Sequence, residues 1–309
     1  MPTPKLQRQV TTLWDYPSQN YGREDQGDRG YTGATPSYII WNCLMRYTNE
    51  KDLVVDPMCG SGTTLDVCRD TNRRPLGYDI NPTRKDIFRS DARKLPIESG
   101  KADFVFVDPP YGDNVNYSDE KDCIGKLPAY EEEYFKAMEK VIAEINRVLR
   151  PDRYMALYVC DYFDKKKGFV PIGFRLHQML SKHFTTVDII SVTRHNKTLT
   201  MGNYRKAADE GNFYLRGFNY LFIMKKEGKG APRVVGTMPD ITEESKPERK
   251  RVSRGDASSF KSRPSSGNRG GERGKPSFRS KPTSGTRDAG RGKPSDRGQG
   301  GGRRGGNDK

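Results

Sequence analysis

A short apolar run that ends in two prolines constrains the fold more than any other feature of this sequence. Phe104-Val105-Phe106-Val107 consists of aromatic and β-branched residues, which predicts a buried strand. Pro109 and Pro110 cannot continue the hydrogen-bonding ladder of a sheet, so we expect the strand to end at Asp108. The sequence therefore places Asp108-Pro109-Pro110-Tyr111 at the carboxyl end of a strand, where open α/β sheets bind ligands.

These four residues suit the binding of a flat base that carries an exocyclic amine. The amine can donate hydrogen bonds to the Asp108 carboxylate and to the Pro109 carbonyl, while the Tyr111 ring stacks on the base. The simpler interpretation is a turn that ends the strand, with Asp108 capping the local backbone. The residues upstream favour the first interpretation.

Upstream, the strand Leu53–Asp56 leads into a glycine-containing loop and then into an amphipathic segment that runs through Arg69. Gly60 and Gly62 allow the loop backbone to approach a ligand closely, and the start of the helix offers free N–H groups. The loop has no Lys or Arg, and it matches neither the dinucleotide fingerprint Gly-x-Gly-x-x-Gly nor a phosphate loop. We therefore do not expect a polyphosphate ligand.

Two more acidic residues end the next predicted strands. Asp79 follows the glycine loop by about 20 residues, the spacing at which an acid at the tip of the second strand can hold ribose hydroxyls. Asp91 ends a third strand and could accept a hydrogen bond from the amino group of an adenine. The alternatives are a helix N-cap for Asp79 and a solvated loop position for Asp91.

Helical patterns alternate with these strands. One helix is predicted over Ser37–Tyr47, with Thr35 as its N-cap, and another over Glu131–Leu149, where the apolar residues form one stripe. A third helix lies within Gly168–Phe184, with Phe174 among its expected core residues. Each of these is more simply a packing element than a binding site.

The remaining strands complete an α/β pattern. Seven strands are predicted: 53–56, 75–79, one ending at residue 90, 104–107, 154–160, 187–192 and 219–224. Strands that alternate with helices indicate a doubly wound, mainly parallel sheet. Two short strands end the domain, so we expect the final strand to pair antiparallel with the one before it, as a hairpin.

The long polar segment between the last two strands, Thr193–Phe218, is a predicted nucleic-acid contact. Loops of this length inside a compact domain are usually functional. The segment combines basic and aromatic side chains, which suits phosphate contact and base stacking. Its candidate nucleic-acid-binding residues are Arg194, His195, Lys197, Tyr204 and Arg205.

The composition changes at about Glu227. Residues 245–309 contain 19 Lys and Arg and 6 Asp and Glu, so they hold +13 of the chain's net charge of +15. Ser, Gly and Pro dominate this stretch, and Arg-Gly-Gly units occur at Arg269 and Arg304. Such a segment cannot bury enough apolar area to fold, so 227–309 is predicted to be a disordered basic tail.

Several classes of protein are not expected. The five cysteines are scattered without a Cys-x-x-Cys pair, and the three histidines lack metal-ligand spacing, so we expect neither a disulfide framework nor a metal site. No window reaches about 18 consecutive apolar residues, and the N-terminus lacks the apolar core of a signal peptide. The sequence therefore predicts a cytoplasmic protein without a membrane partner.

The glycine loop and the tetrad together resemble the N-4/N-6 amino DNA methyltransferases, which use S-adenosylmethionine. The two stretches are 56–64 and 108–111, in this order, each at a strand end. The likeness extends roughly over 11–226 and includes Trp14-Asp15-Tyr16-Pro17, Asn116-Tyr117-Ser118 and Val170-Pro171-Ile172-Gly173-Phe174. It implies a Rossmann-like methyltransferase domain over 31–226, after an N-terminal extension over 1–30 and before the tail 227–309.

The resemblance also implies a role for individual residues. The glycine loop would contact the methionine part of the cofactor, the turn at Thr32–Pro36 would complete that pocket, and Asp79 and Asp91 would bind ribose and adenine. The implied cofactor-binding residues are Thr32, Asp56, Pro57, Cys59, Gly60, Ser61, Gly62, Thr63, Asp79, Asp91 and Ala92. The implied catalytic residues, which would hold the target amine, are Asp108, Pro109, Pro110 and Tyr111.

The implied reaction methylates the N6 of adenine or the N4 of cytosine in DNA, on a base flipped out of the duplex. Larger family members carry a separate target-recognition domain, and here only 112–128 and 193–218 could serve that purpose. Two alternatives remain open. Arg-Gly-Gly tails often accompany RNA binding, so the substrate could be an RNA base, and a nucleic-acid-binding protein with an inactive methylase fold is the alternative outside enzymes.

Overall fold

The computed structural model describes residues 6–228, apart from positions 17, 23, 114, 116, 165 and 166. The chain divides into two compact units, 1–241 and 242–309, and the fold presented here belongs to the first. The predicted disordered tail lies outside the described residues from 229 onward.

The first unit is built on one large mixed sheet. Its strands, in spatial order, are β1 (Leu13–Trp14), β9 (Thr185–Thr193), β10 (Phe218–Lys225), β6 (Leu149–Val159), β5 (Ala102–Val107), β2 (Leu53–Asp56), β3 (Arg74–Asp79) and β4 (Ile87–Arg89). Every neighbouring pair is parallel except the two that involve β10, which is antiparallel to both β6 and β9. The expected doubly wound, mainly parallel sheet with an antiparallel final strand is confirmed.

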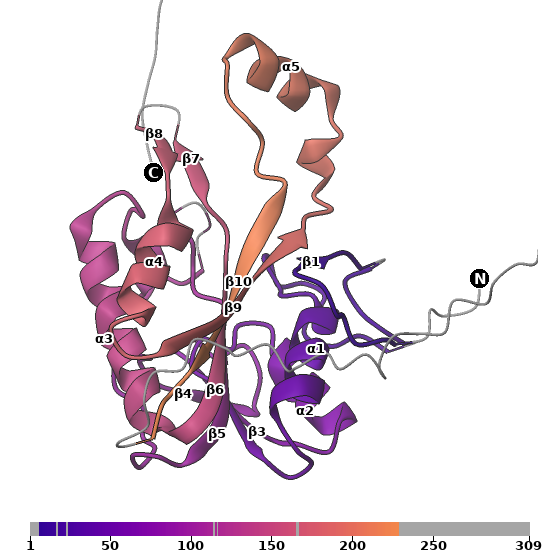
Figure 1. Ribbon diagram of the computed structural model, residues 1–309. Helices are drawn as coiled ribbons and strands as arrows, with labels where there is room; N and C mark the ends of the chain where they lie inside the picture. Colours follow the sequence, from indigo (N-terminus) through magenta and orange to yellow (C-terminus); the bar gives the residue numbers. More distant parts are fainter. Residues whose placement is uncertain are drawn as a thin grey trace, which may run out of the picture. The chain divides into compact units, whose positions relative to one another are not determined.

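The helices cover both faces of this sheet. They are α1 (Ser37–Tyr47), α2 (Thr63–Asp70), α3 (Glu132–Val148), α4 (Ile172–Leu180) and α5 (Gly202–Glu210), with short 3-10 turns at η1 (Ile124–Lys126) and η2 (Lys197–Leu199). Figure 1 shows α1 and α2 on one side of the sheet and α3 and α4 on the other.

Alternation along the central strand β5 supplies both cores. Phe104 and Phe106 are buried with residues of α1 and α2, whereas Val105 and Val107 are buried with residues of α3 and α4. Successive side chains of a strand point to opposite faces, so one fully buried strand can hold two helical layers. This burial fixes the position of Asp108, the next residue in the chain.

The structure differs from the predicted strand count. The sheet has eight strands rather than seven, because β1 pairs with β9 through Leu13 and Trp14. The Trp14 ring is buried, and its Nε1 donates a hydrogen bond to the carbonyl of Thr11. A strand of two residues shows no alternation, so only its tertiary packing reveals it.

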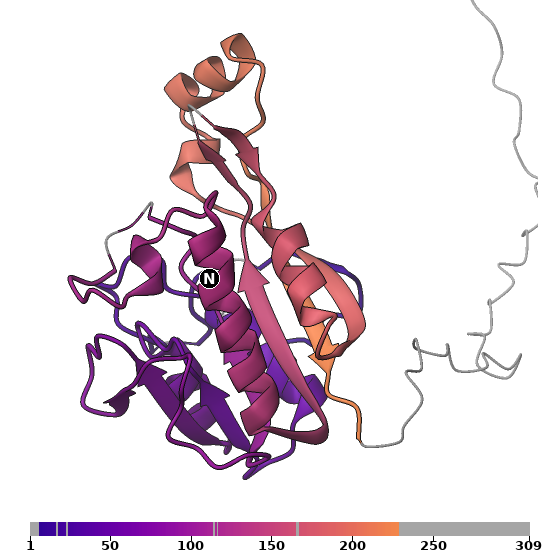
Figure 2. The same ribbon diagram turned by 90° about the vertical axis from the view of Figure 1, so that its left-hand side faces the viewer.

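Two further elements lie beyond the carboxyl edge of the sheet. A separate two-stranded hairpin consists of β7 (Tyr162–Asp164) and β8 (Gly168–Val170), so the beginning of the segment 168–184 is a strand and not a helix. Residues 194–217, which we call the arm, join β9 to β10 and contain η2 and α5, so this segment is not an irregular loop. The hairpin and the arm rise from the same edge of the sheet in both views (Figures 1 and 2).

Residues that precede position 31 also contact the sheet domain. The Tyr21 hydroxyl donates to the Asp70 carboxylate at the end of α2, and the Gly27 amide donates to Asp66 on the same helix. The domain limits proposed from the sequence remain predictions, but this part of the N-terminal stretch packs against α2.

Candidate active site

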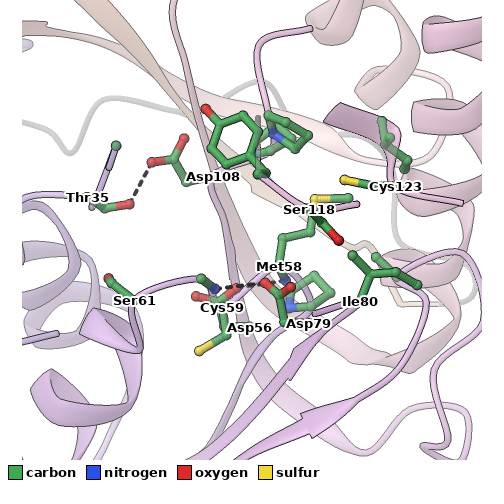
Figure 3. A pocket seen from close by; sticks show the side chains of 18 of the residues that line it. Thr35, Asp56, Met58, Cys59, Ser61, Asp79, Ile80, Asp108, Ser118 and Cys123 are labelled. Atoms are coloured by element: carbon green, nitrogen blue, oxygen red, sulfur yellow. Dashed lines mark hydrogen bonds between the residues drawn. The ribbon is translucent and has the colours of Figure 1, made fainter. Parts of the chain in front are cut away.

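Acidic side chains meet at the carboxyl ends of the parallel strands. Asp56 ends β2, Asp79 ends β3, Asp91 follows β4, and Asp108 follows β5. All four line one pocket, which also includes the glycine loop, the tetrad and the segment after it (Figure 3). Parallel strands bring their carboxyl ends to one edge, so residues from four separate stretches share this cavity.

The glycine loop holds its shape through two positive backbone angles. Gly60 has φ +45° and Gly62 has φ +81°, conformations that side chains disfavour. A Cβ on Gly60 would lie 2.9 Å from the Tyr31 ring, and a Cβ on Gly62 would lie 2.5 Å from the Arg84 guanidinium. The loop therefore needs glycine both for its backbone and for the close approach of its neighbours.

Asp56 stabilises this loop through two hydrogen bonds. Its Oδ1 accepts from the Met58 amide at 3.0 Å, and its Oδ2 accepts from the Thr64 hydroxyl at 2.5 Å. Burial raises the pKa of Asp56 to about 7, although these hydrogen bonds favour the carboxylate. Asp56 thus joins the end of β2 to the start of α2 and fixes the loop between them.

Asp79 and Asp91 are already partly engaged by the protein. Asp79 accepts from the amides of Gly60 and Asn81, both at 2.9 Å, and no helix follows it, so it is not a helix N-cap. Burial opposes ionisation of Asp91, but a bidentate ion pair with Arg93 leaves its pKa lowered. Both acids are therefore oriented before any ligand binds.

The glycine loop carries no free cation. Arg84 passes behind it, and its guanidinium is paired with Asp66 at 2.7 Å and with Asp86 at 2.8 Å. This charge arrangement favours a neutral or cationic ligand over a polyphosphate.

Asp108 is held by two hydroxyl groups. Its Oδ2 accepts from Thr35 Oγ1 at 2.6 Å, and its Oδ1 accepts from the Tyr111 hydroxyl at 2.7 Å; Figure 3 shows Thr35 and Asp108 facing each other. Burial raises the pKa of Asp108 to about 7, against the effect of both hydroxyls. The carboxyl group therefore sits near the midpoint of its titration at neutral pH.

The prolines of the tetrad present their carbonyls differently. The Pro110 carbonyl accepts from the buried Tyr134 hydroxyl at 2.8 Å, which ties the tetrad to α3. Within the described part of the chain, no hydrogen bond reaches the Pro109 carbonyl. The Pro109 carbonyl thus keeps its capacity to accept from a ligand, as the sequence analysis expects.

Comparison with known proteins identifies the family of this chain. The family described as DNA methylase, N6_N4_Mtase, matches residues 3–90 and 102–279. This chain belongs to the DNA methylase family. The expected resemblance to the amino DNA methyltransferases is confirmed by that match.

Two curated relatives match shorter stretches. The Type II methyltransferase M.HpaI of Haemophilus parainfluenzae is 30% identical over 71 residues, which are 23% of this chain and 22% of the relative. The Type II methyltransferase M.MjaII of Methanocaldococcus jannaschii is 25% identical over 126 residues, 39% of this chain and 21% of the relative. The matched stretches thus span only about a fifth of each relative's length.

Solved structures resemble the fold more distantly. TrmN from Thermus thermophilus has a TM-score of 0.43 at 16% identity, over 63% of this chain and 50% of that one. A geranyl diphosphate methyltransferase has a TM-score of 0.40 at 11% identity, over 61% and 75%. TM-scores of this size do not indicate a function.

Most of the predicted site residues of this family member lie together. Those that line the pocket are Asp56, Pro57, Cys59, Gly60, Ser61, Thr63, Asp79, Asp91, Ala92, Asp108, Pro109, Pro110 and Tyr111. Thr32 is exposed and lies outside the lining, and Gly62 serves as the N-cap of α2 against Arg84. The individual roles of these residues stay predictions.

The predicted nucleic-acid residues are more dispersed. Arg194 and Tyr204 line a second hollow between the hairpin and the arm, while Arg205 lines a smaller one on the arm. His195 Nε2 pairs with Asp15 Oδ1 at 2.6 Å, and Lys197 is exposed on η2. The second hollow shares Tyr111 and Tyr117 with the pocket at the strand ends.

Some site residues escaped the sequence analysis. Pro36, not Thr35, is the N-cap of α1, so the expected cap was wrong and the Thr35 hydroxyl serves Asp108 instead. Tyr31 and Tyr117 line the pocket, and burial raises the pKa of Tyr117 to about 12, so it stays a neutral phenol. These contacts join residues that are distant in the chain, so no local sequence pattern predicts them.

Phe174, expected in the core, is 67% exposed.

The described residues lack membrane-spanning helices and clusters of metal ligands. None of their helices is long and apolar enough to cross a membrane. In the same part of the chain, no group of three His, Cys, Asp or Glu side chains is placed to hold a metal ion.

Proposed function

We propose that this protein transfers a methyl group from S-adenosylmethionine to the exocyclic amine of adenine or cytosine in DNA. The observation that carries the proposal is Asp108, which ends the central strand inside the same pocket as the glycine loop. Membership of the DNA methylase family supports it. The DNA substrate and the cytoplasmic location expected from the sequence are parts of this proposal.

The donor set of the pocket fits S-adenosylmethionine. The proposed contacts are the glycine-loop backbone with the methionine part, Asp79 with the ribose hydroxyls, and Asp91 and Ala92 with the adenine. Five acidic residues line the pocket, while Arg84 is neutralised by Asp66 and Asp86, so a positively charged sulfonium is favoured there. When bound, the cofactor would supply an electrophilic methyl group: the amine lone pair would form the new nitrogen–carbon bond, and the sulfur would keep the electron pair of the broken sulfur–carbon bond as a neutral thioether.

Asp108 and Pro109 would position the amine. The lone pair of an aromatic amine is delocalised into the base, so hydrogen bonds from the amine to the Asp108 carboxylate and the Pro109 carbonyl favour the pyramidal, nucleophilic form. The amine loses one proton after the new nitrogen–carbon bond has formed. Asp108, with a pKa of about 7, is suited to accept it.

The Tyr111 hydroxyl occupies the position on Asp108 Oδ1 that this mechanism gives to the amine. We therefore expect Tyr111 to give up that hydrogen bond when a base enters, and its ring to stack on the base. Thr35 can remain on Oδ2 throughout, because the two hydroxyls use different oxygens.

The experiment is a transfer assay with S-adenosylmethionine labelled in its methyl group. DNA and RNA pools are incubated separately with the full-length protein and digested to nucleosides, with an Asp108→Ala variant as control. We expect labelled N6-methyladenine or N4-methylcytosine from DNA with the wild type alone. Label found only in RNA would mean that the substrate is RNA and not DNA. If a protein that binds the cofactor transfers label to neither pool, the proposal of an active enzyme is contradicted.

A further inference from the structure

The hollow between the hairpin and the arm has two arginines at its base. Arg194 follows the last residue of β9, and Arg216 precedes the first residues of β10. Their strands are paired there, because the Arg194 amide donates to the Gly217 carbonyl at 3.0 Å. Both side chains are half-buried and line the hollow.

Neither arginine has a carboxylate partner among the described residues. Arg194 Nη1 contacts the buried Cys160 Sγ at 2.9 Å, and an Arg216 Nη donates to the Tyr214 carbonyl. Arg216 Nε is buried with no hydrogen-bond partner in the described structure. The Arg216 guanidinium also lies over the Phe169 ring, 5.1 Å from its centroid. Half-buried guanidinium groups are normally paired with carboxylates, so two without one in a single hollow indicate a site for an anion.

The acid that lies in the same hollow is hydrogen-bonded to other groups. Asp161 accepts from the Gly173 amide at 2.9 Å and from the Tyr220 hydroxyl at 3.1 Å. It forms no ion pair with Arg194 or Arg216 in the described part of the chain. Its hydrogen bonds fix the start of α4 instead.

The walls of the hollow are aromatic. They include Tyr162 and Phe163 from the hairpin and Tyr204, Phe213 and Tyr214 from the arm. Phe163 and Phe213 stack at 4.7 Å between ring centroids, which closes the hairpin against the arm. Tyr204 and Tyr214 remain exposed, so their faces are available to flat ligands.

One end of the hollow opens beside the proposed acceptor site. Tyr111 and Tyr117 line both this hollow and the strand-end pocket. A ligand that reaches Asp108 through Tyr111 therefore extends, on its way out, past the two arginines.

We propose that Arg194 and Arg216 bind a phosphodiester next to the target nucleotide, on an unpaired strand whose neighbouring bases stack on Tyr204 and Tyr214. The proposal rests on the proposed function for the identity of the target, but the anion site itself does not. Guanidinium groups bind phosphate through forked hydrogen bonds, and aromatic faces accept any base, so this site contributes affinity without reading sequence. Among the predicted nucleic-acid residues, His195, Lys197 and Arg205 lie outside this hollow.

The test is ultraviolet crosslinking of oligothymidylate to the full-length protein, with the crosslinked peptides mapped by mass spectrometry. We expect crosslinks at the aromatic residues of the arm. Their yield should fall about tenfold when Arg194→Gln and Arg216→Gln are combined, as expected for the loss of charge-assisted hydrogen bonds to phosphate. Lys101→Gln, which removes a cation paired with Glu98 at the opposite end of β5, is the matched control and should leave the yield unchanged.

A second version of the experiment uses only wild-type protein, so it does not depend on whether a variant folds. Oligothymidylate in which uncharged methylphosphonates replace the phosphates should lose the same crosslinks with wild-type protein. Crosslinks in the arm that persist without the phosphate charge, or crosslinks confined to residues outside the hollow, would overturn the proposal. Charge-dependent crosslinks in a protein that methylates nothing would leave this site standing and refute the proposed function alone.

Discussion

The two hollows that meet at Tyr111 are built in opposite ways. The strand-end pocket is formed by backbone amides, buried acids and two glycines, and its side chains are hydrogen-bonded to one another. The hollow beneath the arm is formed by half-exposed aromatic rings and unpaired arginines, and α5 above it buries only Ala208. We call the first, whose groups are tied together by these hydrogen bonds, the rigid region, and the second, which few core contacts hold, the adaptable region.

This difference matches two kinds of ligand. A small cofactor of fixed shape benefits from a preorganised pocket, because little ordering is required when it binds. A polymer strand must enter and leave, and a weakly anchored element tolerates that movement at low cost in stability. Thus the proposed division assigns the cofactor and the target base to the rigid region, and the neighbouring strand to the adaptable one.

The largest expected effect comes from Asp108→Ala. This change should reduce methyl transfer about 10³-fold or more, since it removes the acceptor that positions the amine. Affinity for S-adenosylmethionine, measured by calorimetry, should stay close to that of the wild type. Substantial transfer by this variant would show that Asp108 is only a structural residue.

Asp79→Asn should give the reverse pattern. Loss of a charged acceptor for ribose hydroxyls should weaken cofactor binding by roughly 1.5–3 kcal/mol. Because Asp79 also accepts from Gly60, circular dichroism must first confirm that the variant is folded. Unchanged affinity in a folded variant would limit Asp79 to supporting the loop.

Thr35→Val should lower kcat about tenfold, because a hydrogen bond to a charged acceptor contributes roughly 1.5–3 kcal/mol. Thr35→Ser keeps the hydroxyl and should recover most of the rate. The hydroxyl also favours the ionised form of Asp108, so the acidic limb of the kcat–pH profile should move to higher pH in the valine variant alone. A profile that does not move would mean that Thr35 acts only through packing.

The buried acids should affect stability in a defined direction. The pKa of Asp108 is raised to about 7 in the folded protein, above its ordinary value of 3.8, so the folded state binds more protons than the unfolded chain between those values. The contribution of this group to the free energy of unfolding therefore decreases as pH rises through that window and stays low above it. Asp108→Asn should raise Tm more at about pH 8 than at about pH 5. An equal gain at both pH values would argue against the raised pKa.

Removal of residues 229–309 should have the smallest effect on turnover. Residues 245–309 hold +13 of the net charge of +15, so a truncated protein should bind nonspecific DNA more weakly and with a flatter salt dependence. Its rate on saturating substrate should stay within about twofold, because the proposed catalytic groups precede the tail. An identical salt slope after truncation would exclude the tail as an electrostatic tether.

The sequence predicted the rigid region well. Strand ends at Asp56, Asp79 and Asp108 follow from apolar runs that stop at an acid, proline or glycine, and each of these patterns is local. Parallel packing then brings the ends together without any information beyond the fold class. The position of the strand-end pocket could therefore be inferred from the residues alone.

The adaptable region could not be inferred in the same way. α5 has exposed residues on nearly all sides, so it lacks the apolar stripe by which helices are recognised, and its segment was expected to be a loop. The roles of Arg216 and of the β7–β8 hairpin depend on contacts between residues that are far apart in the chain. Examples are Phe163 with Phe213 and Arg216 with Phe169. The role of Thr35 likewise depends on a partner 73 residues away.

Photolabelling with methyl-tritiated S-adenosylmethionine tests the division between the two hollows most directly. Ultraviolet irradiation of the complex, followed by peptide mapping, shows which residues lie beside the cofactor. The account predicts label on peptides that contain Tyr31 or Cys59, which line the strand-end pocket and not the second hollow. Label that falls instead on the arm, among residues such as Tyr204 and Tyr214, would place the cofactor in the other hollow and contradict the account.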